Sequence, residues 1–438
     1  MPYRSSLCLM ASMVRDGAIS PVELVDAHLA QIAARNPEIN AFVMVLGEEA
    51  RERARALERG DQRGLLYGVP ITVKDSFDMA GIPSRVGSPG RPLTPAARDA
   101  TAVARLLAEG AIVLGRTNTP EMLTRYDTDN PITGRTNNPW DLERTPGGSS
   151  GGEAAAIAAY CSPGGVASDG GGSIRMPAHF CGIAGLKPTP GRISGTGHTP
   201  SLGHPAGLVT TVGPMARGAK DLRLLFSVLC GYDGQDPFSV PVPLREASAE
   251  QVRIDVWEQF YAVPVEPEIR AAVRRAAELA SALGFAVDAF EPRGLERAPN
   301  LWSFFFGQWI AKGSALTAEE ALNNLAARDR MRAALLRQME GVAAVLMPVF
   351  GIAAFRHGES KWLVEGKEIG LFQAAMPAVV ANALGLPAVT VPIAVTEGGI
   401  PVGVQLMGRP FEDEWLLELA IRLEEARGPW LGPAAFAR

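Results

Sequence analysis

The first hydrophobic pattern along the chain is helical and has a clear start. Ser20 can cap the N-terminus of a helix, Pro21 suits the first helical position, and Glu23 stands where a capping box needs a carboxylate. Apolar side chains then recur three or four residues apart, at Val22, Val25, Leu29 and Ile32. This spacing predicts an amphipathic helix with one buried stripe.

Short apolar runs and charged, periodic segments alternate through the rest of the chain, which is typical of an α/β protein with buried strands. Helices are predicted at residues 48–59, 99–109, 268–283 and 413–426. Strands are predicted at residues 40–46, 68–74, 111–114, 285–287, 341–347 and 388–394. No repeat, charge block or low-complexity linker marks a domain boundary, although 438 residues would allow two or three domains.

The composition restricts the class of protein. Hydrophobic residues make up 47% and charged residues 20% of the chain, and 42 Lys and Arg against 47 Asp and Glu give a net charge of −5. A disordered chain has fewer apolar residues and a higher net charge, and a nucleic-acid binder is basic. The 47 glycines and 34 prolines exceed ordinary usage and indicate a turn-rich globular protein. Because the net charge is slightly negative, we expect no nucleic-acid partner.

The cysteine, histidine and apolar patterns argue against disulfides, metals and membranes. The four cysteines form no CxxC pair and the five histidines form no HExxH motif, so we expect no disulfide framework, no metal and no cofactor. Pro377, Pro387 and Pro392 interrupt the most apolar region, and no run reaches the ~18 residues of a membrane span. Since the N-terminus also lacks a signal-peptide pattern, we expect a cytoplasmic protein.

Glycines concentrate between residues 144 and 191. Two runs dominate, Gly-Gly-Ser-Ser-Gly-Gly at 147–152 and Asp-Gly-Gly-Gly-Ser at 169–173, with an alanine-rich helical stretch at 153–160 between them. Backbone N–H groups in such loops can bind a phosphate or stabilise an oxyanion. The Walker and GxGxxG patterns are absent, which disfavours a nucleotide. The first run also fits GxSxG, but no clear strand precedes it, so a Ser-His-Asp hydrolase is not favoured.

Lys74 offers another base for a serine nucleophile. It ends the apolar run at 69–73, and burial can lower the pKa of a lysine until its neutral amine accepts a proton. A nucleophilic serine needs such an adjacent base. On the residues alone, a surface lysine at the end of a strand remains the simpler interpretation.

Several motifs together resemble the amidase signature family. Gly-Val-Pro-Ile-Thr-Val-Lys-Asp at 68–75 and the two glycine-serine runs match the family in order and spacing. So do Asn-Pro-Trp-Asp at 138–141 and Gly-Leu-Lys-Pro-Thr at 185–189, and a late segment at 400–408 adds to the likeness.

The resemblance implies one α/β domain over residues 1–438. Its centre would be a mixed, twisted sheet covered by helices on both faces, as in the amidase signature fold. The core motifs would lie at 68–215, a divergent, substrate-facing region at 240–375, and a return to the core at 376–438.

The resemblance also implies catalytic roles. Lys74 would be the base, Ser149 the bridging serine after a cis peptide bond, and Ser173 the nucleophile that becomes acylated. The oxyanion hole would be formed by the backbone N–H groups of Gly170, Gly171, Gly172 and Ser173. The residues expected to support these loops are Ser150, Asp169 and Arg175.

Two departures from the family concern the substrate side. Gly170 stands where the family often has a hydroxyl residue, and the family's common Phe-Thr pair is missing around residues 371–373. Residues considered for a substrate pocket are Met122, Leu123, Tyr126, Trp302, Phe305 and Gln373. The aromatic residues at 302–306 also suit a buried helix face, and core packing is their favoured role.

Three functions are consistent with this resemblance. The first is an amidohydrolase of small-molecule amides, with aryl amides or carbamates as candidates. The second is the glutamine-dependent amidase component of an aminoacyl-tRNA amidotransferase, disfavoured because residues 208–214 lack that branch's Ser-Ser-Leu-Asp-Gln segment. The third is a non-enzymatic binding protein, against which the intact Lys74, Ser149 and Ser173 set argues. We expect the first, as a monomer or homodimer.

Overall fold

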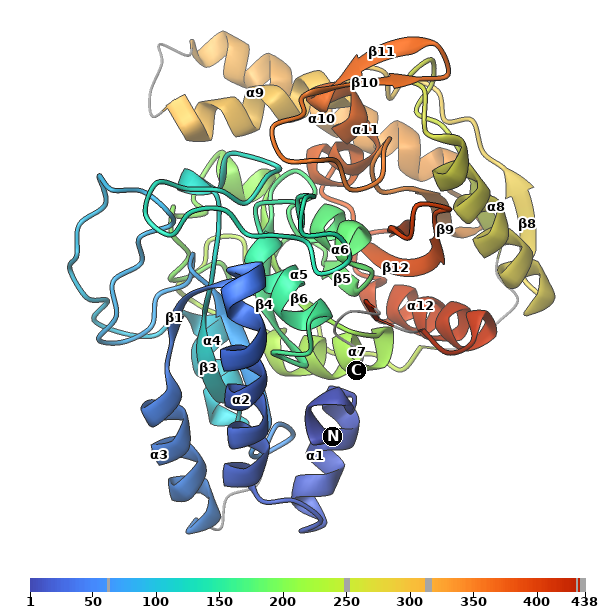
Figure 1. Ribbon diagram of the computed structural model, residues 1–438. Coiled ribbons are helices and arrows are strands. Elements are labelled where there is room, and N and C mark those ends of the chain that lie inside the picture. The colour runs from blue at the N-terminus through green and yellow to red at the C-terminus, as the bar shows by residue number, and fades with distance from the viewer. Residues whose placement is uncertain (61–63, 248–252, 312–316, 431, 434–438) are drawn as a thin grey trace.

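An eleven-stranded sheet runs through the centre of the molecule (Figure 1). The structure is a computed structural model that describes all residues except 61–63, 248–252, 312–316, 431 and 434–438. Its order is β1-β3-β2-β4-β6-β5-β12-β13-β9-β7-β8. The strands are β1 (Phe42–Val45), β2 (Pro70–Lys74), β3 (Ile112–Thr117), β4 (Gly164–Asp169), β5 (Ala184–Lys187), β6 (Thr211–Ala216), β7 (Arg253–Val256), β8 (Ala286–Ala289), β9 (Val342–Pro348), β12 (Ala388–Val395) and β13 (Pro401–Gly408). A separate hairpin consists of β10 (Lys361–Val364) and β11 (Lys367–Gly370).

Helices cover both faces of this sheet. They are α1 (Leu7–Arg15), α2 (Pro21–Ile39), α3 (Gly47–Glu58), α4 (Thr101–Ala108), α5 (Gly151–Ala158), α6 (Arg175–Cys181), α7 (Ala219–Leu229), α8 (Pro267–Ala282), α9 (Ala298–Ala311), α10 (Ala318–Gln338), α11 (Leu371–Ala383) and α12 (Asp413–Arg427). Helices α7, α8 and α12 pack on one face, and α5, α6 and α11 pack on the other. Along β6, Val212 faces the first group and Met215 the second, as the period of two in a strand requires.

The sheet is mixed, with parallel pairing around β2 and around β7, and the parallel part around β2 positions the loops that follow two strands. β2 runs parallel to both β3 and β4, with Thr72 opposite Gly165, whereas the strands from β4 to β9 pair antiparallel. Parallel neighbours end at the same edge of a sheet. The last residue of β2, Lys74, and the last residue of β4, Asp169, therefore reach the same edge.

The helix predicted after residue 20 begins where the capping box indicated. The Ser20 hydroxyl accepts the Glu23 N–H at 3.1 Å, and the Glu23 carboxylate accepts the Ser20 N–H at 2.9 Å. The stripe residues Val25, Leu29 and Ile32 are buried against the core. The predicted α/β class is confirmed, and the strand predicted at 111–114 continues to Thr117.

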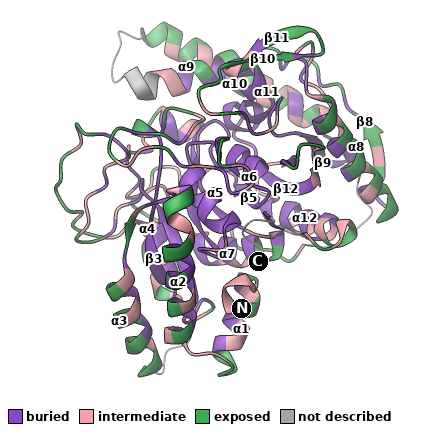
Figure 2. Cartoon of the chain, in the orientation of Figure 1, coloured by how far each residue is buried: buried purple, intermediate pink, exposed green. Residues whose placement is uncertain are grey.

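The hydrophobic pattern predicts none of the strands β4, β5, β6, β7 and β13 of the large sheet. β4, β6 and β13 are rich in glycine, alanine or proline, which have low strand propensity. They form because they lie inside the sheet, where all their residues are buried. Figure 2 shows buried residues gathered in α5 and α6 and in the strands around β5 and β12, while α2 and α3 expose one side.

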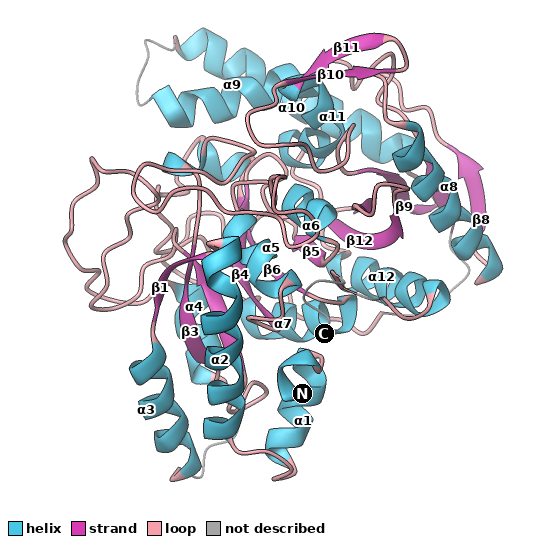
Figure 3. Cartoon of the chain, in the orientation of Figure 1, coloured by secondary structure: helices cyan, strands magenta, loops and turns pink. Residues whose placement is uncertain are grey.

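Long loops connect β2 to α4 and β3 to α5 on one side of the molecule (Figure 3). The second loop ends in the first glycine-serine run and therefore delivers Ser149 to the edge where Lys74 lies. No helix in the described part of the chain is long and apolar enough to cross a membrane.

Candidate active site

Lys74 ends β2 with its side chain fully buried. Its Nζ atom lies 2.8 Å from Ser149 Oγ, 2.9 Å from Ser150 Oγ and 3.1 Å from Ser168 Oγ. These hydroxyls come from the loop before α5 and from β4. A surface position, which the residues alone favoured, is therefore wrong for this lysine, because α5 and β4 enclose it.

Burial sets the charge of Lys74. It lowers the pKa of the amine from its ordinary range to about 7, while the nearby carboxylates of Asp169 and Glu153 act in the opposite direction. A substantial fraction of neutral amine is thus present near neutral pH, and a neutral amine can accept a proton.

A second lysine shows why geometry must identify the base. Burial also lowers the pKa of Lys187 to about 7, and the charge of Arg175 adds to this effect. Its Nζ donates to the carbonyl oxygens of Pro188 at 3.1 Å and Leu386 at 2.7 Å. No hydroxyl is among its hydrogen-bond partners in the described part of the chain. Lys187 therefore braces backbone, whereas Lys74 faces three hydroxyls.

Ser149 is held in a turn that only small residues can form. The peptide bond between Gly148 and Ser149 is cis, and Gly147 has a φ of +85°. A Cβ on Gly148 would lie 2.6 Å from the carbonyl oxygen of Arg125. Because glycine has no side chain, the backbone at Gly148 can lie against the backbone of Arg125. The turn directs the Ser149 hydroxyl toward Lys74, just before α5 begins.

Ser173 lies in the turn between β4 and α6 and is 9% exposed. The N–H of Ser150 donates to the carbonyl oxygen of Ser173 at 3.2 Å, which joins the two glycine-serine loops. Within the described ranges, the Ser173 hydroxyl makes no hydrogen bond to another protein group. The hydroxyl is thus uncommitted beside the loop that carries Ser149.

The backbone after β4 offers donors for a developing oxyanion. The N–H of Gly172 already donates to Asp169 Oδ1 at 2.7 Å. The N–H groups of Gly170, Gly171 and Ser173 have no acceptor among the described residues. Four backbone N–H groups are predicted to form an oxyanion hole. Three of them are free to bind an oxyanion, whereas the N–H of Gly172 is already bonded to Asp169.

Asp169 and Arg175 hold this loop from behind. Both are fully buried and form an ion pair at 3.0 Å, and Asp169 also accepts the N–H of Ile174 at 3.1 Å. Arg175 donates in addition to Gln405 Oε1 at 2.8 Å and Asn382 Oδ1 at 2.6 Å. Burial acts to raise the pKa of Asp169, but the charge of Arg175 and its hydrogen bonds to the carboxylate hold that pKa well below its usual range. The pair links the loop to β13 and α11.

Two aromatic side chains hold the carbonyl groups of the same loop. Trp302 Nε1 donates to the carbonyl oxygen of Gly170, and the Tyr126 hydroxyl donates to that of Gly171, each at 2.6 Å. The Trp302 ring stacks on Phe306 with ring centroids 5.0 Å apart and on Phe372 at 6.1 Å. The aromatic stack is therefore attached to the loop before Ser173.

The other residues considered for a pocket have different surroundings. Phe305 is 2% exposed and packs edge-to-face on Phe304 inside the core, as the core-packing role favoured for this aromatic segment requires. Gln373 is exposed, and its side chain accepts the N–H of Gly370 at 3.0 Å, so it caps the start of α11. Leu123 is buried and Met122 half-buried in the turn that leads to Tyr126.

Three polar residues around Lys74 were not singled out from the sequence. Ser168 lies on β4, and His198 Nε2 is 2.9 Å from its hydroxyl. Glu153 accepts hydrogen bonds from Thr72 at 2.5 Å and Thr117 at 2.7 Å, and burial raises its pKa. A glutamate in an otherwise alanine-rich helix was a usable signal. His198 stands in a loop without any comparable pattern.

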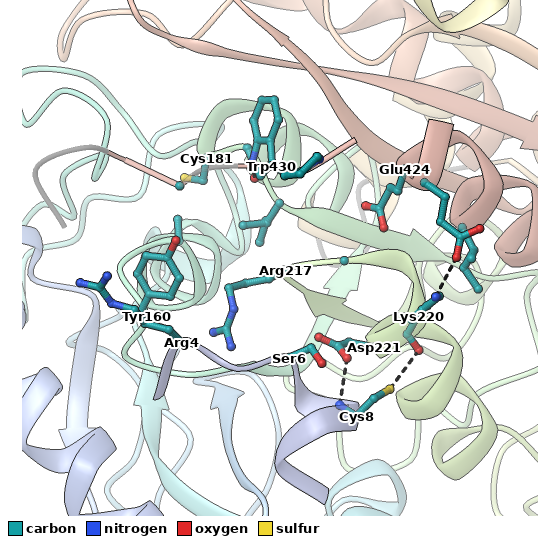
Figure 4. A pocket seen from close by; sticks show the side chains of 18 of the residues that line it. Arg4, Ser6, Cys8, Tyr160, Cys181, Arg217, Lys220, Asp221, Glu424 and Trp430 are labelled. Atoms are coloured by element: carbon teal, nitrogen blue, oxygen red, sulfur yellow. Dashed lines mark hydrogen bonds and ion pairs between the residues drawn. The ribbon is translucent and has the colours of Figure 1, made fainter. Parts of the chain in front are cut away.

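A cavity of about 600 Å³ lies elsewhere, between the N-terminal segment, α7 and α12. Figure 4 shows Arg217 and Tyr160 on one side of it and Glu424 and Lys220 on the other. Lys74, Ser149 and Ser173 do not line it, so it is separate from the candidate site. No cluster of three or more potential metal ligands (His, Cys, Asp or Glu) occurs in the described residues.

The chain is similar in sequence to known proteins along most of its length. The sequence model of the family described as Amidase matches residues 23–323 and 302–417. An indoleacetamide hydrolase of Bradyrhizobium diazoefficiens is 35% identical over 95% of this chain and 86% of its own length. One component of the glutamyl-tRNA(Gln) amidotransferase of Anaeromyxobacter sp. (strain K) is 33% identical over 95% of both chains.

A solved structure is similar throughout. It is that of a bacterial aryl acylamidase, described as an amidase signature enzyme. It has a TM-score of 0.87 and 27% sequence identity, and the match covers 97% of this chain and 96% of that one.

Proposed function

Because this chain belongs to the amidase signature family and is an amidohydrolase acting on C–N bonds, we propose that it hydrolyses small-molecule amides through an acyl-enzyme on Ser173. The observation that carries the proposal is the buried Lys74 amine, 2.8 Å from Ser149 Oγ on the loop joined to Ser173. It would act without cofactor, as a cytoplasmic monomer or homodimer.

The first half of the proposed reaction is acylation. Neutral Lys74 accepts the hydroxyl proton of Ser149 while Ser149 accepts that of Ser173, whose oxygen attacks the acyl carbon. The carbonyl oxygen becomes an oxyanion beside the free N–H groups of Gly170, Gly171 and Ser173. When the C–N bond breaks, Ser149 returns its proton to the leaving nitrogen and recovers one from Lys74.

The second half is hydrolysis of the ester on Ser173. Water takes the place of the amine and loses a proton through Ser149 to Lys74 as it attacks the acyl carbon. The same N–H groups stabilise the second oxyanion. Its collapse breaks the ester bond, and the proton returns to Ser173, so the enzyme ends in its starting state.

Aromatic amides are the proposed substrate class. The indole of Trp302 and the rings of Phe306 and Phe372 form an aromatic stack attached to the oxyanion loop, in which Trp302 is buried and the Phe372 ring is 40% exposed. Flat rings prefer to pack on such surfaces. The activities of two relatives, an indoleacetamide hydrolase and an aryl acylamidase, agree with an aromatic group on one side of the bond. Aryl carbamates share the acyl-enzyme route and are the next class to test.

A glutamine-dependent role is the second candidate. The amidotransferase component that is 33% identical over 95% of both chains favours it. In that case the purified chain would release ammonia from glutamine only with a partner protein. Hydrolysis of an aryl amide by the chain alone would instead support the first proposal.

The deciding experiment is a screen of the purified chain against anilides, arylacetamides, aliphatic amides, aryl carbamates and glutamine. Intact mass and peptide mapping would locate an acyl group trapped on Ser173. We expect Ser173→Ala to remove both activity and acylation, and Ser149→Ala to reduce both while the fold is kept. A Ser173→Ala enzyme that keeps most of the wild-type rate would contradict the proposal.

A further inference from the structure

His198 lies directly behind the proposed base, in the loop that follows β5. Its side chain is 4% exposed and packs edge-to-face on Phe77 with ring centroids 5.2 Å apart. The next residue, Thr199, donates its N–H to the carbonyl oxygen of Ser76 at 2.7 Å. The loop is thus attached to the segment that follows Lys74, and the position of the ring is determined relative to the base.

The hydrogen bonds of the ring assign its proton. His198 Nδ1 lies 2.8 Å from the carbonyl oxygen of Pro200, and a carbonyl oxygen only accepts, so Nδ1 carries the hydrogen. Burial lowers the pKa of His198 to about 3, so the ring is neutral. Nε2 then has a lone pair and can only accept.

Ser168 connects this lone pair to the base. Its Oγ atom lies 2.9 Å from His198 Nε2, so the hydroxyl must donate its single proton there. Toward Lys74 Nζ, 3.1 Å away, the same oxygen can therefore only accept. One N–H of the lysine amine is committed to Ser168.

Ser150 commits the second N–H of the amine. Its hydroxyl donates to the carbonyl oxygen of Ser168 at 3.3 Å, so its oxygen accepts from Lys74 at 2.9 Å. A neutral amine has two hydrogens and one lone pair. With both hydrogens used, the lone pair is left for Ser149, whose Oγ is 2.8 Å away. The remaining contact, to the carbonyl oxygen of Ser168 at 3.5 Å, is long.

We infer that His198 is a positioning residue: by taking the proton of Ser168 it makes Ser168 an acceptor and directs the lone pair of Lys74 to Ser149. The inference rests on the proposed function, because it matters only if Lys74 is the base. It concerns the direction of the lone pair and not the charge of the amine. The charged groups that act on that amine are Asp169, at the end of β4, and Glu153, on α5.

A pair of substitutions separates the two ring nitrogens. Gln places an amide oxygen near the position of Nε2 and can accept from Ser168, whereas Asn reaches only the position of Nδ1. We expect His198→Asn to lower kcat roughly 10²-fold with little change in KM, because the base is misoriented. His198→Gln should recover most of that loss.

The rate at which a fluorophosphonate labels Ser173 gives a second readout that needs no substrate. At alkaline pH Lys74 is neutral in every variant. If His198 orients the lone pair, the His198→Asn variant should still be labelled more slowly than the wild type at this pH. If high pH restores the rate, or if Gln and Asn lose activity equally, His198 does not orient the base and the inference is wrong.

A double-mutant cycle tests the route through Ser168. If His198 acts through Ser168, then Ser168→Ala should lower kcat about as much as His198→Asn, and the double variant should be no slower than either. If the kcat losses of the two single variants multiply in the double variant, the inference is wrong. His28→Asn is the matched control, since His28 is also a buried histidine with Nδ1 on a backbone carbonyl, at 2.9 Å, but lies on α2. It should leave kcat unchanged.

The outcomes also distinguish this inference from the proposed function. If wild-type enzyme neither hydrolyses an amide nor becomes labelled at Ser173, the proposed function fails. If the wild type does both and the folded His198→Asn variant, checked by circular dichroism, matches it in kcat and labelling rate, only the role of His198 fails.

Discussion

The indole Nε1 of Trp302 donates a 2.6 Å hydrogen bond to the carbonyl oxygen of Gly170. The residue comes from α9, more than a hundred positions after the loop that it holds. This bond gives one side chain two functions, since the same ring also stacks on Phe372 and Phe306. The surface proposed to bind the substrate is therefore mechanically connected to the proposed oxyanion donors.

Trp302→Phe tests that connection, because it keeps a ring for stacking and removes the donor. The bond is worth about 1 kcal/mol, so kcat/KM should fall roughly fivefold. We expect the fall in kcat with KM nearly constant, measured by steady-state kinetics on an aryl amide. A change confined to KM would show that the residue serves binding alone.

The pH dependence of kcat/KM should report the Lys74 amine. The base must be neutral, and burial lowers its pKa to about 7. As the pH is lowered through about 7 the amine becomes protonated, so kcat/KM should decrease on the acid side and reach its full value above this pH. Lys74→Met should lower kcat/KM about 10²- to 10⁴-fold and abolish this limb. Lys187→Met is the matched control, since it removes a similarly buried lysine and should change stability while the acid limb stays in place.

Asp169→Asn should destabilise the fold by about 3–5 kcal/mol, because it leaves the buried Arg175 charge without its partner. The folded-state pKa of Asp169 lies below its unfolded value, so its stabilisation is present above about pH 4 and is lost as the pH falls further. Urea unfolding of wild type and variant at neutral and acidic pH would measure this difference. A difference that stays constant on acidification would contradict the assignment.

Substitutions at two adjacent residues on α11 should affect different properties, one substrate binding and the other stability. Phe372 is 40% exposed and stacks on Trp302, so Phe372→Ala should raise KM for aryl amides more than for aliphatic ones. Gln373 caps the helix through Gly370, so Gln373→Ala should cost about 0.5 kcal/mol of stability and leave KM unchanged. Kinetics and thermal melts of the two variants would check both statements. Equal effects on KM would contradict the placement of Gln373.

Local features could be predicted well from the sequence. The start of α2 at Ser20 depends on hydrogen bonds between residues three positions apart, which the residue types alone specify. Central strands such as β4 were missed, because their glycines and alanines form strands only when neighbouring strands supply the hydrogen bonds. Likewise, nothing near Gln373 indicated whether its amide would face a substrate or its own helix.

By itself the sequence determined the α/β class and brought Lys74, Ser149 and Ser173 into one hypothesis through their motifs. Only the tertiary structure decided which hydroxyls meet the amine, because Lys74 and Ser149 are 75 positions apart and meet only after β2 pairs with β4. It also decided that His198, 30 positions from Ser168, stands behind the base. Local sterics act over a few residues, whereas such contacts depend on the order of strands in the sheet and on the packing that buries them.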